Sequence, residues 1–330
     1  MTKSVQLPPP GPAWAGSLMG TSIAATLTNL HGWPVVPWVF AIIAAGICAY
    51  ITVGWLVHRT PAFSHLKMGP WGMYAMGILA LGSAWTSVAG MDVFQIVTWW
   101  IGTALAIWVC LLQLRGFEGE PNFTWGLALV APMVGATGGG QLAVDHGPVY
   151  WYVGAACFVL SVVTGIPIFA RVYVDVVRGK FAPSGAAAGT AWIPLGIVGQ
   201  STAAAQVLFG GWYGTLHGTV MFSVGIVLVA YAAYRFWPAI ARWEEYGPGW
   251  WGSTFPTGTI SLGAHYLALT TGAAWLETVS VLFLCLLVVH WSSCVARWAW
   301  WLSHESPRAV DGARPRADTA DAAGAVGARA

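Results

Sequence analysis

Charged side chains are scarce in this sequence of 330 residues. Lys, Arg, Asp and Glu make up 8% of it, whereas about a quarter of the residues in an ordinary soluble domain are charged. Hydrophobic residues reach 57%, so a water-soluble fold would lack the polar surface needed to cover itself. The cations are spread thinly rather than clustered, which gives no basic patch for a nucleic acid. The composition excludes a soluble catalytic domain and indicates a membrane protein, with the lipid bilayer as its surroundings.

Catalytic and metal-binding motifs are also missing. The five cysteines lie inside hydrophobic segments without a CxxC pair, so neither a disulfide framework nor a zinc site is expected. No Walker loop, HExxH or GxSxG motif occurs, which argues against ATP-driven transport or hydrolysis by this chain alone. His217, His265 and His290 show no repeating spacing of the kind that a bis-histidine haem site needs. We therefore expect no enzyme activity, no metal and no cofactor.

The fourteen Lys and Arg residues fall in alternate gaps between hydrophobic segments. These gaps hold Lys3; Arg59 and Lys67; Arg115; Arg171, Arg178 and Lys180; Arg235 and Arg242; and Arg297, Arg308, Arg314, Arg316 and Arg329. The other gaps, around 31–34, 90–92, 140–147, 210–215 and 271–274, contain no cation. Cytoplasmic loops retain Lys and Arg, so the pattern predicts a multi-pass protein of the cell membrane with both termini in the cytoplasm.

Counting the segments gives ten transmembrane helices. The predicted spans are 13–30, 36–57, 71–90, 93–114, 123–141, 148–170, 187–209, 216–237, 249–271 and 275–301. The predicted organisation is a Pro-rich cytoplasmic lead (1–12), a transmembrane domain (13–301) and a disordered cytoplasmic tail (302–330) that is rich in Ala, Arg and Asp.

The odd-numbered segments differ from the even-numbered ones. The even segments are bulky and apolar, whereas the odd ones are rich in Gly, Ser and Thr, and three of them contain Pro132, Pro194 or Pro256. Interior proline removes a backbone hydrogen bond, and unpaired backbone within a membrane is tolerated only against protein or a water-filled cavity. We therefore predict five helical hairpins whose odd helices surround a central pathway. Close helix packing through small residues is the alternative explanation. The residues predicted to line the pathway are Gly20, Thr21, Pro132, Gly135, Pro194, Gly196, Gln200, Thr254, Pro256, Thr257, Gly258, Thr259 and His265.

Three motifs carry a resemblance to a known family. They are MGTSI in the first segment (19–23), IPLGIVGQ in the seventh (193–200) and WWGSTFPTGT in the ninth (250–259). The chain resembles the tellurite-resistance/dicarboxylate transporter family, which includes the plant guard-cell slow anion channel, fungal malate permeases and the fungal sulfite efflux pump. The resemblance implies a quasi-fivefold pore lined by the odd helices, with the even helices outside, and a homotrimer. It also implies a phenylalanine on the ninth helix that blocks the pore, and Phe255 matches that residue.

No Lys or Arg is expected well inside a span, so anion preference would come from helix N-termini, exposed amides and hydroxyls. We predict an anion channel or exporter of modest selectivity that passes small anions such as chloride, nitrate, bisulfite or a dicarboxylate. The alternative is a proton-coupled secondary transporter of a C4-dicarboxylate (malate) or sulfite, for which His265 is the candidate proton site. Glu277, near the outer end of the tenth segment, is expected to cap that helix or to contact another subunit.

Overall fold

The computed structural model describes residues 6–306, and over that range the chain forms α-helices and short 3-10 helices without a strand. The odd-numbered α-helices are α1 (Ala15–Leu30), α3 (Met68–Ala89), α5 (Leu127–His146), α7 (Ile193–Leu208) and α9 (Thr254–Thr271). The even-numbered ones are α2 (Val36–His58), α4 (Val93–Gln113), α6 (Pro148–Val177), α8 (Gly211–Ala241) and α10 (Ala274–His304). The predicted all-helical class with ten segments is confirmed.

A 3-10 helix precedes each odd-numbered α-helix. The five are η1 (Pro12–Trp14), η2 (His65–Lys67), η3 (Phe123–Gly126), η4 (Gly185–Trp192) and η5 (Pro248–Ser253). The chain therefore repeats one unit five times, in the order 3-10 helix, odd α-helix, even α-helix.

These 3-10 helices correct the prediction of three interior prolines. Pro132 does lie inside α5, but Pro194 is the second residue of α7 and Pro256 is the third residue of α9. In the first turn of an α-helix the missing N–H would have had no intrahelical partner anyway, so proline is tolerated there without breaking the helix. Two of the expected bends are instead junctions between a 3-10 helix and an α-helix.

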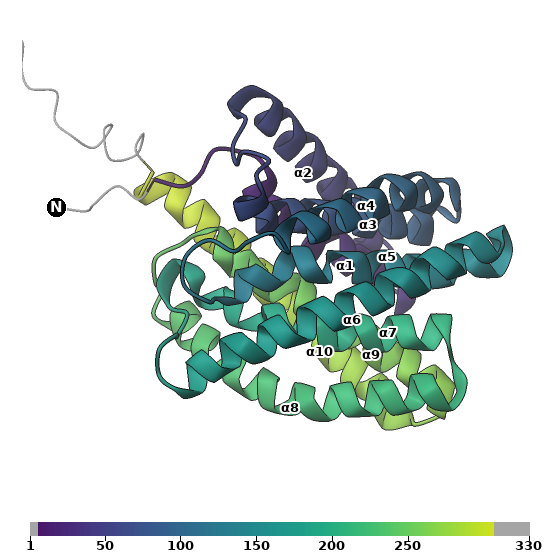
Figure 1. Cartoon of the computed structure of the whole chain (residues 1–330). Helices are drawn as coiled ribbons and strands as arrows, with labels where there is room; N and C mark the ends of the chain where they lie inside the picture. Colours follow the sequence, from purple (N-terminus) through teal and green to yellow (C-terminus); the bar gives the residue numbers. More distant parts are fainter. Residues whose placement is uncertain (1–5, 307–330) are drawn as a thin grey trace, which may run out of the picture.

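The odd-numbered helices form a closed ring. Each packs against the next in order, and α9 packs back against α1. Each even-numbered helix packs against the odd helix before it, and in Figure 1 the long helices α2 and α8 run along opposite edges of the molecule. Every residue of α7 except Val207 is buried, whereas most of α8 is not. The quasi-fivefold symmetry of this ring stays a prediction.

Seven helical stretches in residues 6–306 are long and apolar enough to cross a membrane, and α1, α7 and α9 are not among them. Helices α1 and α7 have 16 residues each, which gives about 24 Å of α-helix. Their polar and small residues are covered by neighbouring helices instead of lipid, so low hydropathy carries no penalty there.

Three even-numbered helices are longer than predicted. They continue to Val177 in α6, Ala241 in α8 and His304 in α10. Arg171, which follows the predicted span 148–170, therefore lies within α6, and Arg235 and Arg297 lie further from their helix ends than the predicted spans placed them. All three remain at the same end of their helices as the predicted cationic gaps. The predicted positions of Lys3, Arg308, Arg314, Arg316 and Arg329, and nearly all of the predicted tail, lie outside the described residues.

Candidate functional site

Two adjoining cavities lie within the ring of odd helices. The smaller has a volume of about 30 Å³ and the larger about 260 Å³. Every odd-numbered helix contributes to both. Three side chains, those of Val134, Gln200 and Phe255, line both cavities. We call these three the constriction, because they stand where one cavity gives way to the other.

The wall of the smaller cavity is almost entirely apolar. It includes Met19, Met73, Met76, Leu127, Val130 and Ile193. A volume of about 30 Å³ holds no more than about two water molecules. A narrow apolar segment of this kind blocks ions by losing its water.

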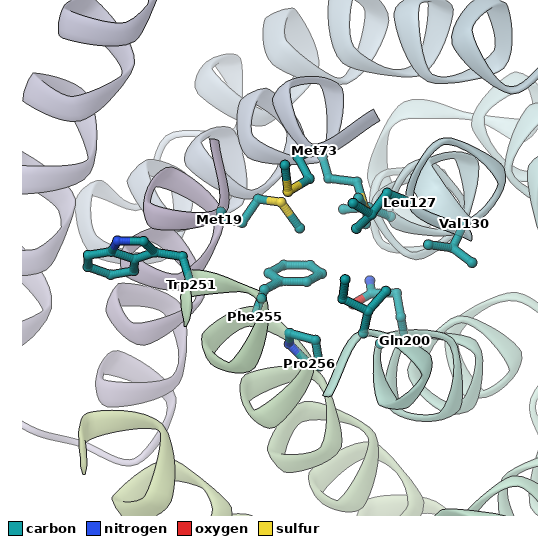
Figure 2. Close-up of a pocket in the computed structure, with 14 residues that line it drawn as sticks. Met19, Met73, Leu127, Val130, Gln200, Trp251, Phe255 and Pro256 are labelled. Atoms are coloured by element: carbon teal, nitrogen blue, oxygen red, sulfur yellow. The ribbon is translucent and has the colours of Figure 1, made fainter. Parts of the chain in front are cut away.

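Phe255 occupies the centre of this site. It is the second residue of α9, is only 5% exposed, and in Figure 2 its ring points into the cavity between Met19 and Gln200. The junction before α9 is held by hydrogen bonds: the Thr254 hydroxyl donates to the Trp251 carbonyl over 2.9 Å, and the Trp251 ring N–H donates to the Tyr246 hydroxyl over 2.8 Å. The start of α9, and with it Phe255, is therefore fixed relative to the axis.

The larger cavity has neutral polar groups in its wall. The Gln95 amide donates to Gln141 over 2.7 Å, and Gln141 donates to the Tyr266 hydroxyl over 2.9 Å. Nearby, the Asn29 amide donates to the hydroxyl and the carbonyl of Ser87. These groups offer hydrogen bonds to a hydrated solute without a fixed charge.

No charged or histidine side chain of residues 6–306 lines either cavity. The electrostatic field in the two cavities therefore comes from the backbone. Leu127 and Ile193 begin α5 and α7 and line the smaller cavity, and α9 begins one residue before Phe255. The N–H groups of Leu127, Ile193 and Thr254 donate to carbonyls of the preceding 3-10 helices, so the positive ends of these helices lie at the starts of η3, η4 and η5. Such an end favours an anion by about 1 kcal/mol or less near a surface.

Of the residues predicted to line the pathway, Gly196, Gln200 and Pro256 line a cavity, as does Phe255. The structure places the others outside both linings: Gly20, Thr21, Pro132, Gly135, Pro194, Thr254, Thr257, Gly258, Thr259 and His265.

Many of these ten residues hold the ring together instead. Gly20 lies directly against the Thr254 side chain, so that a Cβ on Gly20 would overlap it. Gly258 faces Ile23 in the same way. Thr257 contacts His290. Many of the small residues on the odd helices thus serve the close packing that was the alternative explanation, and the cavity linings contain both small and large side chains.

His265 lies in a separate polar cluster between α1, α9 and α10. Its Nδ1 is 2.9 Å from the Glu277 carboxylate, and the His31 Nδ1 lies 3.5 Å from the same carboxylate. Glu277 therefore has partners within its own chain. His31 also contacts the Ser280 hydroxyl at 3.0 Å. Residues 6–306 contain no group of three or more His, Cys, Asp or Glu side chains placed to hold a metal ion.

Sequence reasoning missed the three methionines and the Gln95–Gln141–Tyr266 chain. Neutral polar residues inside apolar spans were the available signal for Gln95 and Gln141. Met19 stands in the MGTSI motif, but nothing marked Met19, Met73 or Met76 as a lining residue, because methionine is equally at home in any apolar contact.

A ring of buried helices around a neutral axial pathway is the architecture of a membrane channel or transporter. Residues 11–299 match the voltage-dependent anion channel family, so the chain belongs to that family. The predicted resemblance is therefore confirmed over most of the chain. No individual curated protein gives a significant match.

Proposed function

We propose that this protein is an anion channel of the cell membrane whose axial pathway is closed by the Phe255 side chain. The observation that carries the proposal is that Phe255 lines both cavities at the point where they meet. Family membership supports anion transport, and the uncharged walls support passage rather than tight binding.

The preference for anions rests on the backbone dipoles of α5, α7 and α9, whose positive ends lie on the side of the smaller cavity, and on the absence of carboxylates from both linings within residues 6–306. Because these contributions are small, we propose modest selectivity, with chloride, nitrate, bisulfite and small carboxylates ranked largely by the cost of removing their water. The proposed orientation has both termini in the cytoplasm, and the proposed assembly is a homotrimer.

The test is a flux assay in liposomes with chloride, nitrate, sulfite and malate. We expect Phe255→Ala to raise the flux of the smaller anions about tenfold or more, because it removes the side chain that fills the constriction. Phe222→Ala is the matched control: Phe222 is a partly buried residue of α8 that lines neither cavity. Equal fluxes for the wild type and Phe255→Ala would refute the closure.

Proton-coupled transport of a dicarboxylate or sulfite is the second candidate. It requires a titratable group in the pathway, and the cluster of His31, His265 and Glu277 lies outside both cavity linings. We therefore favour the channel. Anion flux that persists with no pH difference across the membrane supports the channel, and flux that vanishes without one supports coupling.

A further inference from the structure

Gln200 is the polar side chain of the constriction, and one of its polar atoms has no partner. The residue is 4% exposed and lines both cavities, and Figure 2 shows its side chain beside the Phe255 ring. Its Nε2 lies 2.7 Å from the Thr137 hydroxyl, whereas its Oε1 is buried without a hydrogen bond. A buried carbonyl oxygen left without a donor is costly.

Turning the amide by 180° about its last torsion exchanges the oxygen and the nitrogen with almost no change in shape. The Thr137 hydroxyl then donates to Oε1. It gives up only a long contact of 3.4 Å to the Met133 carbonyl. In this orientation the amide oxygen is satisfied and the N–H₂ is the group without a partner, so the turn is favourable only when an acceptor such as an anion reaches the N–H₂.

An N–H donor at this position contacts an anion at the constriction, where the anion gives up water to enter the small apolar cavity. On the larger-cavity side, hydroxyls and amides can replace lost water. Within the smaller cavity the other lining side chain with a polar group is Trp251, and its N–H is engaged by Tyr246. An anion that passes Phe255 therefore finds its side-chain hydrogen bond at Gln200.

We infer that the Gln200 amide is a binding site for a small inorganic anion at the constriction: the N–H₂ turns to donate to the anion, and the Thr137 hydroxyl then donates to the amide oxygen. This inference rests on the proposed function. A donor offsets dehydration most for the strongly hydrated ion, so Gln200 favours chloride relative to nitrate.

The experiment uses planar-bilayer currents in a Phe255→Ala background, with chloride and nitrate as the probes. We expect Gln200→Met, which keeps the shape of the side chain, to lower the chloride current about tenfold and to raise the nitrate-to-chloride permeability ratio. Thr137→Val should shift the ratio in the same direction by a smaller factor, whereas Thr137→Ser should leave it unchanged. If Gln200→Met fails to fold, the comparison of Thr137→Val with Thr137→Ser tests the inference instead.

Gln206→Met is the matched control, because Gln206 is a buried glutamine on the same helix that lines neither cavity. It should leave the permeability ratio unchanged. A Phe255→Ala current whose size and ratio are unaffected by Gln200→Met overturns the assignment of Gln200 alone. If Phe255→Ala carries no anion current, the proposed function fails and the Gln200 site fails with it.

Discussion

The Nδ1 of His290 lies 3.1 Å from the Thr257 hydroxyl, and this contact joins α10 to the helix that carries Phe255. The Trp237 ring N–H donates to the Nε2 of His290 over 3.2 Å, so Nε2 is an acceptor and Nδ1 carries the proton. Nδ1 then donates to Thr257, whose hydroxyl donates to the Ser253 carbonyl over 2.7 Å. The chain of hydrogen bonds runs from α8 through α10 to the junction between η5 and α9.

We predict that His290→Ala increases anion leak through the otherwise wild-type protein. The substitution removes the acceptor of the Trp237 N–H and the donor to the Thr257 hydroxyl, two hydrogen bonds worth about 0.5–1.5 kcal/mol each, and it frees the start of α9. Trp237→Phe removes only the first donor, so a smaller leak is expected. The measurement is chloride efflux from liposomes. Thr164→Val serves as the control, because it deletes a hydroxyl from α6 that bonds the Leu160 carbonyl; a leak of equal size in that variant would argue against a specific role for His290.

The close contacts within the ring of odd helices predict that alanine substitutions at two glycines, Gly199 and Gly46, will have different effects on stability. A Cβ on Gly199 of α7 would overlap the backbone of Thr259 in α9, whereas a Cβ on Gly46 of α2 would meet nothing within 4 Å. We expect Gly199→Ala to lower the free energy of unfolding in detergent by about 1–3 kcal/mol or more. Gly46→Ala should be neutral or stabilising by about 0.5–1 kcal/mol, because alanine restricts the unfolded chain and favours a helix. Equal stabilities for the two variants would contradict the helix packing.

The cluster of His31, His265 and Glu277 predicts a dependence of stability on pH. Burial lowers the pKa of His31 below its ordinary value of 6.5, although the Glu277 carboxylate partly offsets this and the neighbouring His265 adds to it. The unfolded chain therefore binds the proton more readily at mildly acidic pH. The stability contributed by neutral His31 is present in full above about pH 6.5 and is lost as the pH falls through the lower pKa of the folded state.

We accordingly expect the wild type to lose more thermal stability than His31→Gln between pH 7.5 and pH 5.5. Glutamine can keep a hydrogen bond to Ser280 but does not titrate, which makes it the matched comparison. The measurement is the melting temperature of the purified protein at the two pH values. If the two proteins lost the same stability, the linkage would reside in other groups.

Much of the architecture was predictable because it depends on composition along the chain. The alternate placement of residues such as Arg115 and Arg242 gave the count of ten helices, and the motif around Phe255 gave the family. The face of each odd helix that lines the axis was not predictable. A helix such as α7, buried on all sides, has no apolar stripe opposite a polar one, so periodicity cannot distinguish the axis face from the packing faces.

The helix starts were missed for a related reason. A proline such as Pro194 or Pro256 is compatible with a bend inside an α-helix and also with the first turn after a 3-10 helix, and the local sequence does not separate the two. The difference arises in the tertiary structure, where η4 packs against η5 and the Trp250 ring N–H donates to the Gly185 carbonyl over 3.2 Å.

The measurement that tests the central claim most directly is the planar-bilayer current of a series at position 255, recorded at equal pH on both sides with a chloride gradient. The account predicts that conductance rises in the order Phe255→Trp, wild type, Phe255→Leu and Phe255→Ala, with a reversal potential near that of chloride. A conductance that does not depend on the size of this side chain, or a current carried by cations, would contradict it.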